Sequence, residues 1–452
     1  MLLKKTLKKI NEKVCLVEIF GVGYIGFPIC MKLANSGFDV NGIEINKEKL
    51  KRFEKGDLVN FELNHKKAFI RARKSRKLLI SSNSKKFDKP KIGIICVPTP
   101  IPTKKISSNF YVINAVNNFL STCKNGDVMI IESSIEVGTI DKIHKIIEKK
   151  GFAVGKNFGL AYCPERIDPL NVKWDIHNIP RVIFCSDEIT FKIAKRIYKN
   201  VNKGNLIKVS SPKVAEIVKS FENAFRLVNI SLVNELAMLC EKLNVSVSEV
   251  IRAASTKPFG FMPFYTSAGA GGHCIPKDPI FLVNSSKKYK MKLKNIECAV
   301  KTNNEVPSYI AQSINKILSR IKGKKVIVWG LTYKENINDM RDSPGIKLIQ
   351  LLKKSGHEVI GFDPYFDKTI KETYLKENNV KVQFDILNKI SEKQISNFDC
   401  IVVVQHHKKM KRKLEKIYQK SLVPIIYDCQ SKTQVNLSSK TILKFFGDNE
   451  VI

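Results

Sequence analysis

The stretch VCLVEIFGVGYIG, residues 14–26, decides the fold of the first part of the chain. An apolar run with the composition of a buried strand leads directly into Gly21, Gly23 and Gly26. Glycines at this spacing allow a tight turn, close approach of the backbone to a pyrophosphate, and close packing of the next helix on the strand. The stretch therefore predicts a strand, a dinucleotide-binding turn and a helix, although a glycine turn without a ligand has the same local pattern. Glu18 does not fit a buried central strand.

An acidic residue follows the next apolar run. Glu44 ends the segment VNGIE, residues 40–44, eighteen residues after Gly26. A carboxylate at this place accepts hydrogen bonds from the ribose hydroxyls of the adenosine and repels a 2′-phosphate. The pattern therefore favours NAD over NADP.

Strand and helix patterns alternate on both sides of a helical middle. Before it, strand-like runs lie at 92–97, 128–132, 160–162 and 182–185, and after it at 325–329, 358–362, 400–404 and 424–427. Such a βαβ rhythm predicts a parallel sheet with helices on both faces. We therefore expect an α/β fold of two Rossmann-like domains joined by a helical central region with a long connecting helix. The expected parts are a basic leader (1–12), an NAD-binding domain (13–210), a helical central domain for dimerisation that carries the cysteine loop (211–320) and a C-terminal Rossmann-like domain (321–452).

The long helix is expected from Val214 to about Asn244. Its apolar residues recur in steps of three and four, which makes one wide stripe. The positions are 217, 218, 221, 225, 228, 232, 236 and 239. A stripe of this width on a helix between two domains favours a spine that also forms a homodimer interface.

Composition excludes several classes of protein. The chain of 452 residues is 43% hydrophobic and 27% charged, with no apolar run long enough for a membrane span. Its net charge of +36 comes from lysines spread along the chain without a nucleic-acid-binding motif, so we expect solvated lysine faces and no nucleic-acid partner. The leader is expected to be frayed and solvated, with a membrane-surface helix as the alternative. Eleven scattered cysteines without metal-site spacing predict reduced thiols, no metal and a cytoplasmic protein.

One cysteine lies in a different setting. Cys274 belongs to GAGGHCIPKD, residues 269–278, a glycine-rich and partly polar loop that suits a reactive thiol. Its glycines are expected to let a ligand or the nicotinamide ring approach the backbone. Lys277 offers a cation that favours the thiolate, and Asp278 a carboxylate that can move protons. His273 suggests a Cys–His pair or a metal ligand, but adjacent side chains usually diverge.

A polar pair on the long helix adds a further element. Lys219 and Asn223 are four residues apart in VKSFENAF, so they share one face. An ammonium and an amide together can stabilise a developing oxyanion. Exposed polar residues on a solvated helix face are the alternative.

Taken in order, these segments resemble the UDP-glucose/GDP-mannose dehydrogenase family across nearly the whole chain after the leader. Within the family, residues 256–265 (TKPFGFMPFY) and 179–183 (IPRVI) look like the UDP-N-acetylglucosamine 6-dehydrogenase branch. The loop TSAGAGG before the cysteine lacks the prolines usual in that branch. The segments that carry the resemblance are GVGYIG, PTP (98–100), ESS (132–134), CPER (163–166), VKSFENAF, GGHCIPKDP and DMRDSP (339–344).

The resemblance implies a four-electron oxidation of the C6 alcohol of a UDP-sugar to the uronate, by two hydride transfers to NAD. It also implies that the C-terminal domain (321–452) binds the UDP-sugar, and that the product serves the synthesis of a surface polysaccharide such as a capsule. Cys274 matches the nucleophile that forms a thiohemiacetal and then a thioester. Lys219 and Asn223 match the residues that stabilise the oxyanion, while Asp278 and Glu165 match carboxylates for proton transfer and water activation. Cofactor contacts are implied for Gly21, Gly23, Tyr24, Ile25, Gly26, Glu44, Lys49, Thr99 and Ser134, and substrate contacts for Tyr265, Gly269, Lys334 and Arg341.

Other interpretations stay open at this stage. UDP-N-acetylglucosamine is the expected substrate, with UDP-N-acetylmannosamine or UDP-glucose as alternatives. A β-hydroxyacid dehydrogenase also couples a dinucleotide domain to a helical one, but it uses a lysine without a cysteine nucleophile. A non-catalytic protein that binds NAD or nucleic acid is the other alternative. We expect an active site in the cleft between the two α/β domains, closed by the loop 259–272.

Overall fold

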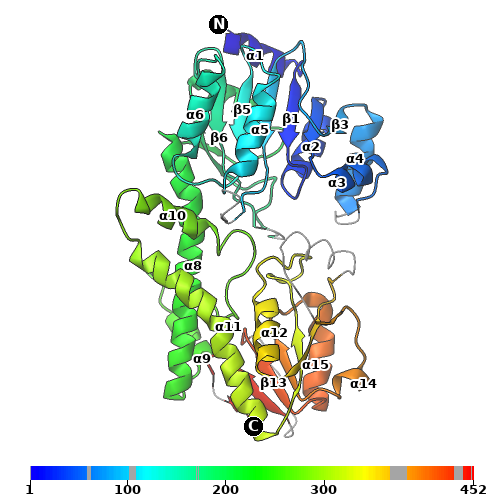
Figure 1. Ribbon diagram of the computed structural model, residues 1–452, viewed down its shortest axis with the longest axis vertical. Helices are drawn as coiled ribbons and strands as arrows, with labels where there is room; N and C mark the ends of the chain where they lie inside the picture. The colour runs from blue at the N-terminus through cyan, green and yellow to red at the C-terminus, as the bar shows by residue number, and fades with distance from the viewer. Residues whose placement is uncertain are drawn as a thin grey trace. The chain divides into compact units, whose positions relative to one another are not determined.

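The computed structural model describes residues 2–58, 63–100, 108–168, 171, 173–366, 384–431, 441–448 and 450–451. The chain forms two compact units, Met1–Phe221 and Glu222–Ile452, and the boundary falls within the long helix α8 (Pro212–Leu243) (Figure 1). The helix agrees closely with its expected bounds. Among the described helices, none is both long and apolar enough to cross a membrane.

The first unit is built on an eight-stranded sheet of order β3-β2-β1-β4-β5-β6-β7-β8. All neighbouring strands are parallel except β6 and β7. The strand order reverses between β1 and β4, and a reversal of this kind is where open α/β sheets bind their ligands. The bounds are β1 (Leu16–Phe20), β2 (Asp39–Ile43), β3 (Leu78–Ser81), β4 (Lys91–Ile95), β5 (Val128–Ile131), β6 (Gly159–Tyr162), β7 (Arg181–Cys185) and β8 (Leu206–Lys208).

Helices cover both faces of this sheet (Figure 1). Residues of α1 (Leu2–Asn11), α2 (Gly26–Asn35) and α7 (Glu188–Tyr198) share one apolar core with the sheet. Residues of α5 (Phe110–Leu120) and α6 (Thr139–Lys149) share another. The remaining helices of this unit are α3 (Lys47–Glu54) and α4 (Leu63–Lys74).

The basic leader differs from the expectation. Instead of a frayed and solvated segment, it forms helix α1, with Leu3, Thr6 and Ile10 buried. The Thr6 hydroxyl donates to the carbonyl of Gly126 at 2.7 Å. Three inward-facing residues spaced three and four apart bury enough apolar surface to hold the helix on the domain, while its lysines stay in water.

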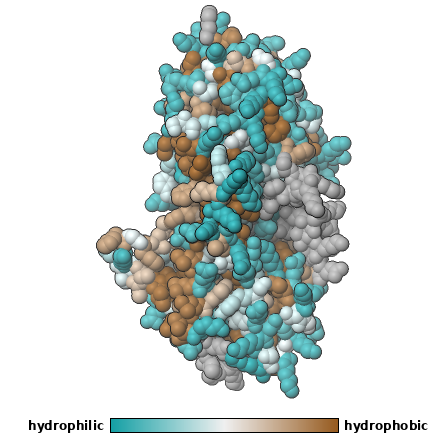
Figure 2. Space-filling model, turned by 60° about the vertical axis from the view of Figure 1, so that its left-hand side comes forward, coloured by the Kyte–Doolittle hydropathy of each residue, from teal (hydrophilic) through white to brown (hydrophobic). Residues whose placement is uncertain are grey.

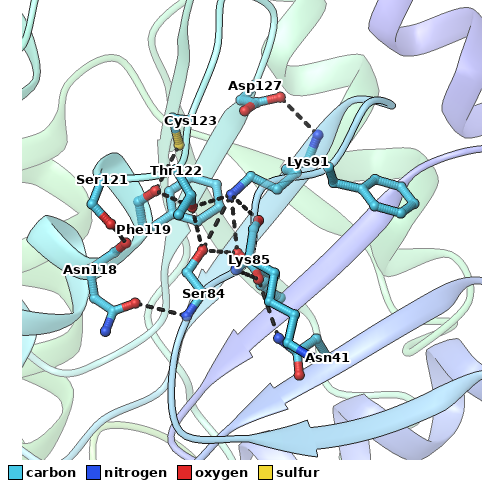
Figure 3. A network of polar contacts seen from close by, with 12 residues as sticks. Asn41, Ser84, Lys85, Lys91, Asn118, Phe119, Ser121, Thr122, Cys123 and Asp127 are labelled. Carbon is cyan, nitrogen blue, oxygen red and sulfur yellow. Dashed lines mark hydrogen bonds and ion pairs between the residues drawn. The ribbon is translucent and has the colours of Figure 1, made fainter.

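The structure also explains Glu18 in the central strand. Glu18 and Lys91 are both fully buried, and their side chains form an ion pair at 3.3 Å. The Glu18 carboxylate also accepts hydrogen bonds from the Ser84 hydroxyl (2.5 Å), the Lys85 N–H (3.0 Å) and the Asn41 amide (3.3 Å). Figure 3 shows Lys91, Ser84 and Asn41 converging in this network. A buried charge is tolerated when it is paired and fully hydrogen-bonded, as it is here.

The second unit is built on a seven-stranded sheet of order β11-β10-β9-β12-β13-β14-β15, parallel except between β14 and β15. The helical segment after Phe221 shares an apolar core with this sheet, through residues such as Ala237, Ile310 and Val328. The strands are β9 (Lys325–Trp329), β10 (Glu358–Phe362), β11 (Ile386–Leu387), β12 (Cys400–Val403), β13 (Ile425–Asp428), β14 (Ile442–Phe445) and β15 (Glu450–Val451). Its other helices are α9 (Val247–Ala254), α10 (Asp278–Lys287), α11 (Lys294–Arg320), α12 (Pro344–Lys354), α14 (Glu392–Ile395) and α15 (Lys411–Lys420), with a 3₁₀ turn η1 (Lys408–Met410).

The expected fold class, two parallel α/β sheets with a helical central region, is therefore confirmed.

Candidate active site

The glycine turn after β1 has the geometry that a dinucleotide requires. Gly21 has a φ of +89°, and a Cβ there would lie 2.7 Å from the Cys96 carbonyl oxygen. A Cβ on Gly26, the first residue of α2, would lie 2.1 Å from the Gly21 carbonyl oxygen, so the helix packs tightly on the turn. A Cβ on Gly23 would meet no atom within 4 Å, which leaves its backbone open to a ligand. The turn therefore fits a pyrophosphate held at the start of α2.

Glu44 lies directly after β2, at the same edge of the sheet. Its side chain is largely buried and accepts a hydrogen bond from the Asn46 N–H at 3.0 Å. Lys49 lies 3.5 Å from the other carboxylate oxygen. The local contacts therefore fix the direction of the carboxylate, and they bring Lys49 to it as an ion-pair partner.

The remaining residues expected at the cofactor follow the strands of this sheet edge. Tyr24 and Ile25 belong to the glycine turn, and Tyr24 is well exposed. Thr99 is buried in the segment after β4, and Ser134 is half-buried in the segment after β5. Because carboxyl ends of parallel strands meet at one edge, these segments lie on the side of the glycine turn.

In the second unit, the backbone of the cysteine loop is held by a buried asparagine. The Ala270 N–H donates to the Asn303 side-chain oxygen at 2.6 Å, and the Asn303 amide donates to the Ala270 carbonyl at 3.1 Å. Gly269, with a φ of +108°, would place a Cβ 3.1 Å from the Asn303 carbonyl oxygen. Asn303 is almost completely buried on α11. Asn303 was not among the site residues predicted from the sequence, because a single asparagine on a helix has no sequence pattern that indicates such a contact.

The glycines before the cysteine admit a protein side chain where we expected a ligand. A Cβ on Gly272 would lie 2.6 Å from the Tyr333 ring, and one on Gly271 would lie 2.6 Å from the Asp342 carbonyl oxygen. The Gly272 N–H also donates to the Arg341 carbonyl at 2.9 Å. The segment 331–344 therefore packs directly on the cysteine loop, and the absence of side chains at both glycines makes this approach feasible.

Cys274 itself is exposed, at the start of a tight turn into α10. Its carbonyl oxygen accepts the N–H groups of Lys277 (3.2 Å) and Asp278 (2.9 Å). Asp278 is fully buried and accepts a hydrogen bond from the Asn223 amide at 2.6 Å. The Lys277 ammonium, also buried, lies 3.6 Å from the other Asp278 oxygen. Cys274 thus lies in the turn that leads into the buried Lys277 and Asp278, and Asp278 connects this turn to the Asn223 amide on α8.

Lys219 lies one turn before Asn223 on α8, and both side chains are largely buried. The interpretation of this pair as exposed polar residues on a solvated helix face is therefore wrong.

Two charged neighbours define the electrostatics of the cysteine loop. Burial, and then the positive charges of Lys277 and Arg341, lower the pKa of His273 to about 3. His273 is therefore neutral near pH 7 and offers no cation to Cys274. Burial would lower the pKa of Arg341, but Asp339, and more weakly Tyr333 and the Cys274 thiolate, raise it above its usual value. The positive charge of Arg341 therefore acts on the Cys274 thiolate.

The residues expected at the substrate occupy different settings. Arg341 binds Asp339 through two nitrogens, at 2.6 Å and 3.0 Å. Lys334 is half-buried, and its carbonyl accepts the Thr332 hydroxyl at 2.9 Å. Tyr265 is 60% exposed at the end of a loop that also exposes Phe259, Phe261 and Met262.

Glu165 belongs to the first unit, in the segment after β6. Its N–H donates to the Glu132 carbonyl at 3.3 Å, and its carboxylate accepts the N–H of Ile167. No three His, Cys, Asp or Glu side chains of the described ranges gather as a metal site would require. Each unit therefore holds one part of the expected chemistry: the dinucleotide turn with Glu165 in the first, and Cys274 with Asn223 and Asp278 in the second.

Comparison with known proteins agrees with this division. The chain matches the NAD binding domain of the UDP-glucose/GDP-mannose dehydrogenase family over residues 15–202, its central domain over 213–305 and its UDP binding domain over 327–434. It is 33% identical over 416 residues to the UDP-N-acetyl-D-mannosamine dehydrogenase of Methanococcus aeolicus, which covers 91% of this chain and 88% of the relative.

Two further proteins extend the comparison. The UDP-N-acetyl-D-glucosamine 6-dehydrogenase of Salmonella typhi is 29% identical over 402 residues, covering 88% of this chain and 91% of the relative. The solved structure of the UDP-D-ManNAc dehydrogenase of Pyrococcus horikoshii superimposes with a TM-score of 0.82 at 27% identity, covering 96% of this chain and 99% of that one. The chain belongs to the UDP-glucose/GDP-mannose dehydrogenase family and is an NAD-dependent oxidoreductase that acts on a UDP-sugar.

Proposed function

We propose that the protein oxidises the C6 alcohol of a UDP-N-acetylhexosamine to the uronate, as a precursor of surface polysaccharide. The observation that carries this proposal is the exposed Cys274 in the turn that leads into the buried Lys277 and Asp278, where the Asn223 amide binds the Asp278 carboxylate. An enzyme that stopped at the aldehyde would need no nucleophile. A thiol at the site allows the aldehyde to be oxidised further.

The residues of the second unit supply most of this chemistry. The Cys274 thiolate adds to the aldehyde carbon and forms a thiohemiacetal, whose oxidation leaves a thioester. NAD, when bound to the glycine turn, accepts the hydride in each of the two oxidations. Asn223 has one amide N–H on Asp278 and a second available for an oxyanion, and Lys219 adds a positive charge one turn away.

Water must then release the acid from the cysteine. Attack of a water oxygen on the thioester carbonyl breaks the carbon–sulfur bond, and the Cys274 thiolate leaves. We assign the removal of the water proton to Glu165, and proton transfer at the thiohemiacetal and thiolate to Asp278. A positioned carboxylate is suited to both tasks because it can accept a proton as a general base and return it as a general acid.

Three further groups are assigned to the nucleotide-sugar. Arg341 presents a planar guanidinium that suits phosphate oxygens, and Lys334 adds a compact cation nearby in the chain. Tyr265, exposed on a loop with other large apolar side chains, is suited to cover the sugar. Gly269 would present its backbone to the same ligand.

The sugar is proposed in order of support. UDP-N-acetylglucosamine comes first, because the segment 256–265 is similar to that of the 6-dehydrogenases for this sugar. UDP-N-acetylmannosamine is the second candidate, because a relative named for it is 33% identical over 91% of the chain. UDP-glucose is the third.

We also propose that α8 joins two copies of the chain. Five apolar side chains along one stripe of α8 are between 42% and 61% exposed, namely Ile217, Phe221, Phe225, Leu232 and Leu239. Figure 2 shows apolar side chains gathered at the lower left of that view. Apolar surface of this extent on a helix favours a self-complementary interface. None of the eleven cysteines forms a disulfide, which supports a reducing compartment, and we assign the protein to the cytoplasm.

Replacement of the nucleophile tests the proposal. Cys274→Ser should abolish uronate formation from the UDP-N-acetylhexosamines, while Cys298→Ser, at an exposed cysteine on α11, should leave it unchanged. Full activity of Cys274→Ser would exclude the covalent mechanism and favour a β-hydroxyacid dehydrogenase. DNA binding without NADH formation from any UDP-sugar would instead favour a non-catalytic protein.

A further inference from the structure

A second buried ion pair of the first unit lies at the edge of the sheet where the ligand-binding segments begin. Because β7 runs antiparallel to β6, its first residue, Arg181, comes to the edge at which β4, β5 and β6 end. Glu132 directly follows β5 at this edge. Arg181 and Glu132 are 2% and 1% exposed, and their side chains pair at 3.1 Å.

Tyr198 contacts both members of this ion pair. The Tyr198 hydroxyl donates to the Glu132 carboxylate at 2.6 Å, and the Arg181 guanidinium lies 4.8 Å from the centre of the Tyr198 ring. Within the described residues, none of the three guanidinium nitrogens makes a hydrogen bond of good geometry. A buried ion pair with so few hydrogen bonds is weak evidence for a purely stabilising role, because apolar residues of similar volume often stabilise a fold equally well.

The pair is connected to the segment that carries Glu165. The Glu165 N–H donates to the Glu132 carbonyl at 3.3 Å, so the position of Glu132 sets where that segment leaves the sheet. Burial would lower the pKa of Arg181, but Glu132 above all, and then Cys163, Tyr198 and Glu165, raise it well above the usual value. The charge of Arg181 therefore acts on Glu165 as well as on Glu132.

We propose that Arg181 is a positioning residue for Glu165 in the release of the thioester, acting through Glu132. This inference rests on the proposed function. Arg181 and Tyr198 hold the Glu132 side chain, and Glu132 holds the backbone of Glu165. In addition, the positive charge of Arg181 acts on the Glu165 side chain.

The test separates hydrolysis from the steps before it. In Arg181→Met, we expect a rapid release of two NADH per active site, followed by turnover slowed about 100-fold, since displacement of a reacting group by about 1 Å has effects of this size. The acyl-enzyme on Cys274 should accumulate and be visible in the intact mass of the protein. The kcat/KM for the UDP-sugar and the affinity for NAD should stay as in the wild type, so the KM for the UDP-sugar should fall together with kcat.

A matched variant controls for simple damage to the fold. Lys91→Met breaks the buried Glu18–Lys91 pair, which involves the first residue of β4 and therefore the opposite edge of the same sheet. If Arg181 had only a structural role, both variants would lower activity alike and neither would accumulate acyl-enzyme.

Tyr198→Phe decides the matter if Arg181→Met does not fold, because it removes only the hydroxyl that donates to Glu132. It should accumulate the acyl-enzyme to a smaller extent. Unchanged turnover without acyl-enzyme in the folded variants would overturn the inference while leaving the proposed function intact. If the wild type released no NADH from any UDP-sugar, the proposed function and this inference would fall together.

Discussion

The contact between Gly272 and Tyr333 makes a quantitative prediction for Gly272→Ala. An alanine at the observed φ of +83° costs about 1–2 kcal/mol, because a Cβ crowds the following carbonyl in this region. The new Cβ would also lie 2.6 Å and 2.7 Å from two Tyr333 ring carbons, which must move. Overpacking of this kind costs about 1–3 kcal/mol. We therefore expect Gly272→Ala to lower the free energy of unfolding by about 2–5 kcal/mol.

Urea unfolding of matched variants separates the two contributions. Gly356 has a φ of +90°, and a Cβ there would meet no atom within 4 Å. Gly356→Ala should therefore cost only the backbone contribution of about 1–2 kcal/mol. In a Tyr333→Ala background, the loss of unfolding free energy caused by Gly272→Ala should fall to the same value, because the contact with the Tyr333 ring is gone. An equal cost of Gly272→Ala with and without the Tyr333 ring would refute the reasoning.

Three other predictions concern single side chains. Glu44→Gln keeps a hydrogen-bond acceptor but removes the charge that repels a 2′-phosphate, so the ratio of kcat/KM for NADP to that for NAD should rise at least about tenfold; an unchanged ratio would show that Glu44 does not face the ribose. His273 has a pKa of about 3 in the folded protein and about 6.5 when unfolded, so between these pH values the unfolded state binds the extra proton and acidification lowers stability. In His273→Asn, the free energy of unfolding should therefore fall less steeply from pH 6.5 to pH 4 than in the wild type, and parallel curves would argue against a neutral, buried His273. Lys91→Met leaves Glu18 buried without its cation and should cost about 3–5 kcal/mol in chemical unfolding; a loss below about 1 kcal/mol would mean that water reaches the carboxylate.

Much of the fold could be predicted from the sequence because its central strands are nearly continuous apolar runs. β1, β4, β5, β9 and β12 are buried on both faces, and such strands stand out against amphipathic helices. The strands that were not predicted are short, and four of them, β3, β8, β11 and β15, form the edges of the two sheets. The fifth, β14, lies next to the edge strand β15. The antiparallel direction of β7 also has no local signature, although it determines where Arg181 lies.

The parts of the site that could be predicted from the sequence are those where the chemistry requires one particular residue type. Gly21 and Gly26 form the tight turn and the close helix packing that their spacing predicts, because only glycine meets those steric demands, whereas a Cβ on Gly23 would meet no atom of the protein within 4 Å. The surroundings of Cys274 were harder, since they come from segments far apart in the chain. Asn303 and Tyr333 reach the Cys274 loop only in the folded chain, and nothing in their local sequence indicates that contact.

The central claim is that one active site carries the sugar from alcohol to acid through Cys274. The most direct measurement is the amount of NADH released from excess NAD when purified protein consumes a limiting amount of UDP-N-acetylglucosamine, with UDP-N-acetylmannosamine, UDP-glucose and GDP-mannose in parallel. The account predicts two NADH for each molecule of one UDP-sugar consumed, and none with Cys274→Ser. A single NADH per sugar, or two NADH that persist in Cys274→Ser, would contradict it.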